Sequence, residues 1–250
     1  MKKITLFAVL FAFVATQYAC KTDDDTVPAS TTTELGLNFN AKYGADDLVL
    51  NDAYDYEGSG VKFSNLNFYI SNIALVKASD TDQTEILEIA LIDFTMAEGN
   101  KVVARNVPTG SYTGIKINIG VPSDLNRLPP TDFATTHPLG NDSQYWSAWD
   151  SYIFAKIEGS MDTLNAQIYD HGFLYHSGTD AANKEISINR SIKLTSGAME
   201  VLEFDFDLKA LFNINGMPLN IKDNPIVHDP NNLTITLDLM NNFNNALSLQ

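Results

Sequence analysis

The clearest structural signal in the chain is the segment Val201-Leu202-Glu203-Phe204-Asp205-Phe206-Asp207-Leu208, in which apolar and acidic side chains alternate. In an extended backbone, successive side chains point to opposite faces, so every second residue lies on the same side. Leucine and phenylalanine therefore line one face, and the carboxylates line the other. This pattern predicts a strand with one face in a hydrophobic core and one face in solvent.

Shorter runs with the same two-residue period extend in both directions from this segment, separated by Gly, Asn, Pro and Asp. They lie at 35–39, 61–63, 66–70 after a break at 64–65, 73–76, 86–94, 112–119, 153–157, 186–194 and 233–239. Long helical periodicity is nearly absent, although 209–212 predicts one helical turn. Many short strands joined by turns are typical of an all-β chain. We therefore predict a single β-sandwich of immunoglobulin-like or Greek-key type over residues 34–250.

Residues 120–150 form the longest segment without a strand signal, and they contain four prolines and both tryptophans. Long ordered loops on a rigid β scaffold often carry function. This loop is therefore the first place to look for a site.

Composition excludes several function classes. The 250 residues include 16 Lys plus Arg against 31 Asp plus Glu, a formal net charge of −15. Such a surface repels phosphate backbones and disfavours a nucleic-acid partner. One cysteine permits neither an intrachain disulfide nor a cysteine-based zinc site. No Gly-x-Ser-x-Gly or phosphate-binding loop is present, and nothing marks Asp150 and Glu158 as an acid/base pair, so we do not expect an enzyme.

The N-terminus resembles a lipoprotein signal. Two lysines precede an apolar run at 4–15, which is shorter than the ~20 residues needed to span a bilayer. The single cysteine, Cys20, follows the small residue Ala19, where a lipoprotein signal is cleaved. Residues 1–19 are thus expected to be a signal peptide and Cys20 the lipidated residue that attaches the protein to a bilayer. Ordinary secretion with an incidental cysteine is the alternative.

The segment after Cys20 is expected to be a flexible tether over 20–33. Its acidic run at 21–25 resembles the surface-export signal of Bacteroidota lipoproteins, and the rest is rich in Thr, Ser, Ala and Pro. These features predict a cell-envelope protein, held at the outer membrane and exposed on the surface.

The histidines suggest a metal site near the tryptophan loop, because imidazole suits copper and zinc. His137 lies in the loop, while His171 and His176 follow it. A five-residue spacing puts His171 and His176 on opposite faces of a regular strand, unless Gly172 introduces a bulge. The alternative is a purely structural role, in which the indoles cover one end of the sandwich and the histidines are ordinary loop residues.

The chain contains, in order, the blocks 66–75 (LNFYISNIAL), 91–94 (LIDF), 107–112 (VPTGSY), 119–122 (IGVP) with Asn126, 145–159 (YWSAWDSYIFAKIEG) and 173–178 (FLYHSG). Together these blocks resemble the MbnP-like copper-binding proteins, which are periplasmic or surface β-sandwich proteins. The block at 145–159 is similar to the family's Trp-x-Trp-x-x-Gly-Tyr run ending in Lys-x-Glu-Gly. Aligned from Tyr152, Trp146 takes the place of the first Trp, whereas Ala148 and Ser151 replace the second Trp and the Gly.

The resemblance implies how copper would be held. In characterised members, a partner dihaem peroxidase oxidises one tryptophan to kynurenine, whose aryl amine joins histidines in binding copper. By this resemblance Trp146 is the residue to be oxidised, with Trp149 as fallback. His176 is then the best-placed ligand, followed by His171 and His137. The expected function is copper uptake or storage.

A second function remains open. The acidic, Asn-rich surface and the aromatic residues Tyr145, Trp146 and Trp149 also fit an adhesion or glycan-binding module without metal, in which the rings stack on a sugar.

Overall fold

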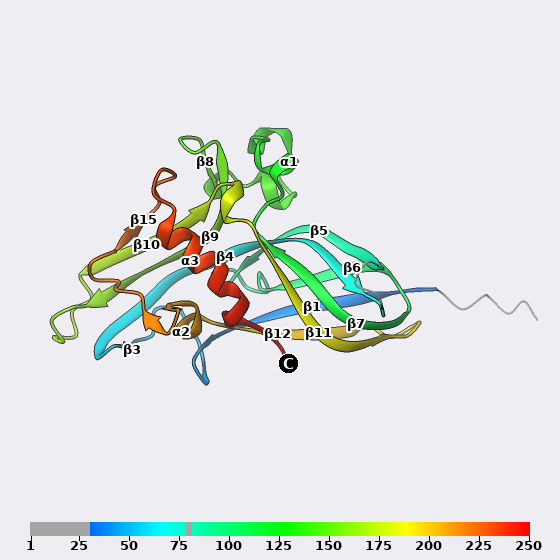
Figure 1. Ribbon diagram of the computed structural model, residues 1–250, viewed down its shortest axis with the longest axis horizontal. Helices are drawn as coiled ribbons and strands as arrows, with labels where there is room; N and C mark the ends of the chain where they lie inside the picture. The colour runs from blue at the N-terminus through cyan, green and yellow to red at the C-terminus, as the bar shows by residue number, and fades with distance from the viewer. Residues whose placement is uncertain (1–30, 79–81) are drawn as a thin grey trace, which may run out of the picture.

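The computed structural model describes residues 31–78 and 82–250, and these fold into two packed β-sheets with few helices (Figure 1). The predicted all-β sandwich is confirmed. Its first strand begins at Thr32, two residues before the predicted domain boundary. The predicted signal peptide, Cys20 and most of the tether lie outside the described residues. Within the described part, no helix has the length and apolar character needed to cross a membrane.

The smaller sheet has five strands, and the segment with the strongest alternation lies inside it. Its strands are β1 (Thr32–Tyr43), β2 (Asp46–Asp47), β6 (Lys101–Pro108), β12 (Glu200–Asp207) and β16 (Leu247–Leu249). β1 is central, because it pairs in parallel with β12 and antiparallel with β6. Phe204 and Phe206 of β12 are fully buried, as the alternation predicts.

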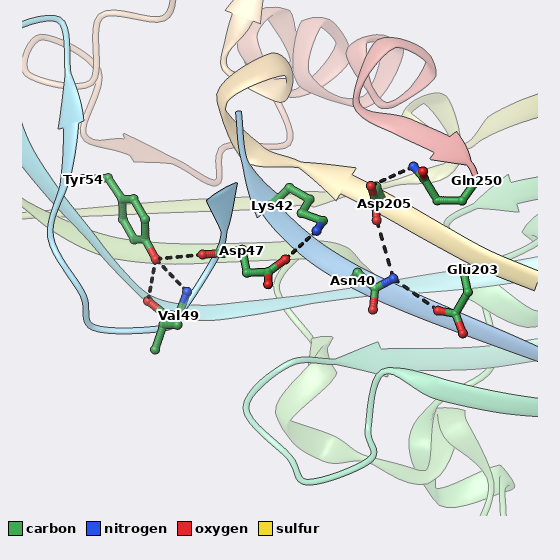
Figure 2. Close-up of polar contacts among 8 residues, drawn as sticks. All are labelled: Asn40, Lys42, Asp47, Val49, Tyr54, Glu203, Asp205 and Gln250. Atoms are coloured by element: carbon green, nitrogen blue, oxygen red, sulfur yellow. Dashed lines mark hydrogen bonds and ion pairs between the residues drawn. The ribbon is translucent and has the colours of Figure 1, made fainter. Parts of the chain in front are cut away.

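The opposite face of β12 is the predicted acidic face, and its carboxylates accept hydrogen bonds from amides (Figure 2). Asn40 Nδ2 donates to Glu203 Oε2 over 3.2 Å and lies 3.5 Å from Asp205 Oδ1. Gln250, at the end of the chain, donates to Asp205 Oδ2 over 2.7 Å. Neutral amide donors thus lie between the acidic side chains of this partly exposed face.

The larger sheet has nine strands and is built around one very long strand, β4. Its strands are β3 (Tyr54–Tyr56), β4 (Ser59–Val76), β5 (Gln83–Asp93), β7 (Gly110–Ile119), β8 (Tyr145–Trp146), β9 (Ser151–Asp162), β10 (His171–Gly178), β11 (Lys184–Leu194) and β15 (Ile226–Val227). The predicted break at 64–65 is a register shift between Phe63 and Asn65, and 73–76 belongs to the same strand. A bulge absorbs one extra residue without ending the strand, which explains the broken pattern.

Phenylalanine rings fill the space between the sheets. Phe68 of β4 contacts Phe39 of β1 with ring centroids 6.0 Å apart, and Phe206 of β12 with centroids 4.8 Å apart. All three side chains are fully buried. Burial of such rings is the main stabilising contribution in a two-layer domain.

The predicted strand at 233–239 is wrong, because these residues open the helix α3 (Thr234–Ala246). Its buried residues are Thr236, Leu239, Met240, Asn242, Phe243 and Ala246, a spacing that follows the helical period of 3.6. The helix packs against α2 (Leu208–Leu211), which confirms the helical turn predicted at 209–212. Phe243 lies 5.4 Å from Phe68, so α3 completes the core.

The predicted long loop is also confirmed. Between β7 and β9 the chain forms the short helix α1 (Ser123–Asn126), three 3-10 turns (Pro130–Asp132, Pro138–Gly140 and Asp142–Gln144) and the two-residue strand β8. In Figure 1 this segment rises above the body of the molecule, close to β9 and β10. A separate hairpin follows α2, and its two strands, β13 (Asn213–Ile214) and β14 (Met217–Pro218), have two residues each.

Candidate functional site

Two histidines come together on one face of the larger sheet. Phe173, Tyr175 and Ser177 of β10 are buried, and His176 points to the opposite face. β15 pairs in parallel with β10, with Leu174 opposite Ile226 and Tyr175 opposite Val227. Continuing this register by one residue places His228 beside His176. The strand pairing therefore brings together two imidazoles that are fifty-two residues apart in the sequence.

Trp146 lies between these histidines and Trp149. Its ring centroid is 4.7 Å from that of His228 and 6.0 Å from that of His176, with the rings inclined to each other. On its other side it stacks on Trp149, at 4.8 Å and an interplanar angle of 8°. The structure thus brings Trp146 and His176 together, and adds His228.

A tight turn positions the tryptophan pair. Trp146 in β8 lies opposite Ser151 in β9, and the backbone N–H of Trp149 donates to the carbonyl of Trp146 over 3.0 Å. Asp150 adopts the left-handed region with a φ of 53°, and its carboxylate accepts the Tyr145 hydroxyl over 2.8 Å. These contacts fold the indole of Trp149 back onto that of Trp146.

Hydrogen bonds from buried side chains fix the loop to the sheet. Asn126 Oδ1 accepts the backbone N–H of Tyr152 over 2.9 Å, and Lys156 Nζ donates to the Ser143 carbonyl over 2.7 Å. The hydroxyls of Tyr69 and Tyr152 donate to carbonyls of the loop, at Pro138 and Leu139. The loop is therefore an ordered part of the structure that holds Trp146 in place.

The two histidines each offer an unpaired nitrogen. His176 Nε2 is 2.7 Å from Glu158 Oε1, while Nδ1 of His176 and Nδ1 of His228 are buried with no hydrogen-bond partner among the residues described. Burial lowers the pKa of His176, and the hydrogen bond to Glu158 opposes this only in part. The His176 ring is therefore neutral at neutral pH, the form in which an imidazole binds a metal.

His171 is placed apart from this cluster. The pairing of β10 with β9 runs without a shift from His171, opposite Met161, to Ser177, so Gly172 introduces no bulge. His171 and His176 therefore point to opposite faces, roughly 17 Å apart along the strand. A site that uses both residues is not formed.

His137 makes its contacts within the loop. Its ring stacks on Phe133 at 4.7 Å, and its Nδ1 accepts the backbone N–H of Leu139 over 3.1 Å. The structure thus places His137 and His171 away from the contact between Trp146 and His176, and it places His228, which the sequence analysis did not single out, beside Trp146. The signal for His228 is weak, because β15 contains only two residues and its register is set by tertiary packing.

Gly178 leaves room for Trp149. A methyl group at this position would lie 2.8 Å from Trp149 Cζ3 and 2.7 Å from the Tyr152 carbonyl. We expect Gly178→Ala to displace the Trp149 ring, change the tryptophan fluorescence and reduce the free energy of unfolding by ~1–3 kcal/mol. Gly172→Ala is the control, because its methyl group would approach no atom closer than 3.9 Å. Unchanged fluorescence in Gly178→Ala would contradict this packing.

Side chains of the residues described form no group of three or more His, Cys, Asp or Glu placed to hold a metal. The cluster supplies two imidazoles and a tryptophan. An unmodified indole has an N–H donor and no lone pair for a metal. An unmodified Trp146 therefore supplies no donor atom to a metal at this place.

Comparisons with known proteins identify a similar fold and a matching family. The structure of MbnP from Methylosinus trichosporium aligns with a TM-score of 0.52 and 15% sequence identity, over 73% of this chain and 78% of that one. A search of curated proteins gave no match. The family model described as MbnP matches residues 32–229, which include the described strands except β16, the tryptophan loop, His176 and His228. Because this match covers most of the chain, the protein belongs to the MbnP family.

Proposed function

We propose that this protein binds copper between His176, His228 and an oxidised Trp146. The observation that supports this most directly is the pair of buried, unpartnered Nδ1 atoms of His176 and His228, two rings that both contact Trp146. Unsatisfied buried nitrogens are costly unless something binds them. Membership of the MbnP family adds independent support for copper as the ion.

The donor set fits monovalent copper. Neutral imidazole nitrogens and an aryl amine are borderline donors, and copper(I) accepts a low coordination number. The site is partly covered, since the side chain of His176 retains 13% of its accessible surface. Partial cover limits exchange with solvent and leaves a route for the ion.

Oxidation of Trp146 would supply the third donor. We propose a dihaem peroxidase as the partner that carries it out. In that step two molecules of hydrogen peroxide are reduced to two of water, and the indole C2–C3 bond breaks with one oxygen added at each carbon. Hydrolysis then releases C2 as formate and leaves a free aryl amine on the ring. Trp146 is the target rather than Trp149, because only Trp146 contacts both histidines in the structure described.

The cellular setting remains part of the proposal. A lipidated Cys20 and the tether would hold the copper-binding domain at the surface of the outer membrane, for uptake or storage of copper. The acidic surface suits this role, because its negative charge attracts cations.

Stacking of a glycan on the tryptophans is less well supported. One face of Trp146 is covered by Trp149, and His228 lies against its ring. Trp149 in turn packs against Gly178. These contacts leave little indole face for a sugar ring.

Copper retention tests the proposal. The protein is co-produced with a dihaem peroxidase, loaded with copper(I), dialysed against copper-free buffer and analysed for bound metal. We expect the parent protein to retain copper, and His176→Ala and His228→Ala each to lose most of it, because a two-donor site binds weakly. His171→Ala is the matched control on the same strand and should retain as much as the parent. Full retention in both His176→Ala and His228→Ala would overturn the proposed site.

A further inference from the structure

A chain of hydrogen bonds across three strands leads to His176. Asn67 Nδ2 donates to Asn65 Oδ1 over 3.0 Å, and Asn65 Nδ2 donates to Glu158 Oε2 over 3.3 Å. The other carboxylate oxygen, Glu158 Oε1, is 2.7 Å from His176 Nε2. The asparagines lie on β4, Glu158 on β9 and His176 on β10. Three packed strands thus fix one carboxylate oxygen against one ring nitrogen.

The charged group of Lys156, on the neighbouring strand, is directed elsewhere. Lys156 lies opposite His176 in the pairing of β9 with β10, but its ammonium group donates to the Ser143 carbonyl. The short contact made by the Glu158 carboxylate in this cluster is therefore to the imidazole. A carboxylate is an acceptor, so the ring nitrogen facing it must carry the hydrogen.

We infer that Glu158 is a positioning residue that holds the His176 proton on Nε2 and leaves the lone pair of Nδ1 free as the copper-binding atom. This inference rests on the proposed copper function, and it names which atom of the ring binds the ion. Nδ1 is the nitrogen that is buried without a partner, which agrees with this assignment. The His176 ring also lies next to the ring of Trp146.

The expected consequence is tighter binding. A carboxylate that accepts the second N–H of a metal-binding imidazole fixes the tautomer and the ring orientation, and raises the basicity of the binding nitrogen. Loss of such a partner typically lowers metal affinity by about 10–100-fold. Glu158 therefore contributes to copper affinity without touching the ion.

The first measurement needs no metal. Nitrogen NMR of isotope-labelled histidines, at about pH 8 where imidazole is neutral, reports which ring nitrogen carries the proton. The nitrogen signals of His176 are assigned by their absence from the spectrum of His176→Ala. We expect them to show that Nε2 carries the proton in the parent protein. Glu158→Ala should shift His176 toward a mixture of both tautomers. Protonation of Nδ1 in the parent protein would overturn the inference.

The second measurement is affinity for copper(I), by competition with a chromogenic chelator. We expect about a 10–100-fold weaker Kd for Glu158→Ala and a smaller loss for Glu158→Gln, which keeps an acceptor oxygen. Glu185→Ala is the matched control, because Glu185 pairs with Lys116 elsewhere on the same sheet. Affinity equal to the parent in both Glu158 variants would overturn the inference, and Glu158→Gln decides the result if Glu158→Ala does not fold. No copper affinity in the parent protein would instead refute the proposed function, and the tautomer measurement would still test Glu158.

Discussion

Trp146→Phe protein, co-produced with a dihaem peroxidase, is expected to keep an unmodified peptide over residues 140–156 and to retain almost no copper. The reason is that Trp146 is the residue whose ring contacts both His176 and His228, so its oxidation would place an aryl amine next to two imidazole rings. Phenylalanine fills much of the same space but cannot yield an aryl amine. Peptide mass spectrometry and metal analysis of the same sample measure both effects.

Trp149→Phe is the matched control. This variant loses part of the stacking on Trp146, worth about 0.5–1.5 kcal/mol, but keeps the residue to be oxidised. We expect it to show oxidation within 140–156 and to retain copper. A modified peptide in Trp146→Phe, or copper retention equal to the parent, would show that Trp146 does not supply the donor.

Local pattern predicted the strands where one face is buried and the other is polar. In β12 the phenylalanines alternate with acidic residues, so the two-residue spacing and the apolar or acidic character of the side chains both indicate a strand with one buried face. α3 shows where this reasoning fails. Ile235 and Leu237 suggest a strand, but the helical face is formed by Leu239, Met240 and Phe243, whose burial depends on α2 and the core. In a short segment, a run of apolar residues fits both the two-residue period of a strand and the 3.6-residue period of a helix.

The candidate site was predicted in part. The family resemblance and the position of the tryptophans directed attention to Trp146 and His176, which the structure brings together. His228 could not be predicted, because its place beside His176 depends on the parallel pairing of β15 with β10. The bulge considered at Gly172 is absent for a related reason. Glycine permits a bulge, but the regular pairing of β9 with β10 does not require one.

Asn126→Ala is expected to destabilise the loop that positions Trp146, although Asn126 is not a proposed copper ligand. Asn126 is 4% exposed, and its Oδ1 accepts from the Tyr152 backbone N–H and from the Ser151 hydroxyl, while its Nδ2 donates to Asp180. Alanine would leave the buried N–H of Tyr152 without a partner, at a cost of about 1–3 kcal/mol, and remove the bonds to Ser151 and Asp180 as well. We expect the free energy of unfolding, measured with urea, to fall by roughly 2–5 kcal/mol in total.

The same substitution should weaken copper binding, because Ser151 is the residue that pairs with Trp146 in the short strand β8. Asn141→Ala is the matched control. Asn141 is exposed in the same loop, and among the residues described its side chain accepts only from Ser143, so its loss should cost less than about 1 kcal/mol and leave copper affinity unchanged. If Asn126→Ala unfolded at the same urea concentration as the parent, the loop would have to be held by its other contacts, such as Lys156 to Ser143. Asn126 would then have no part in positioning Trp146.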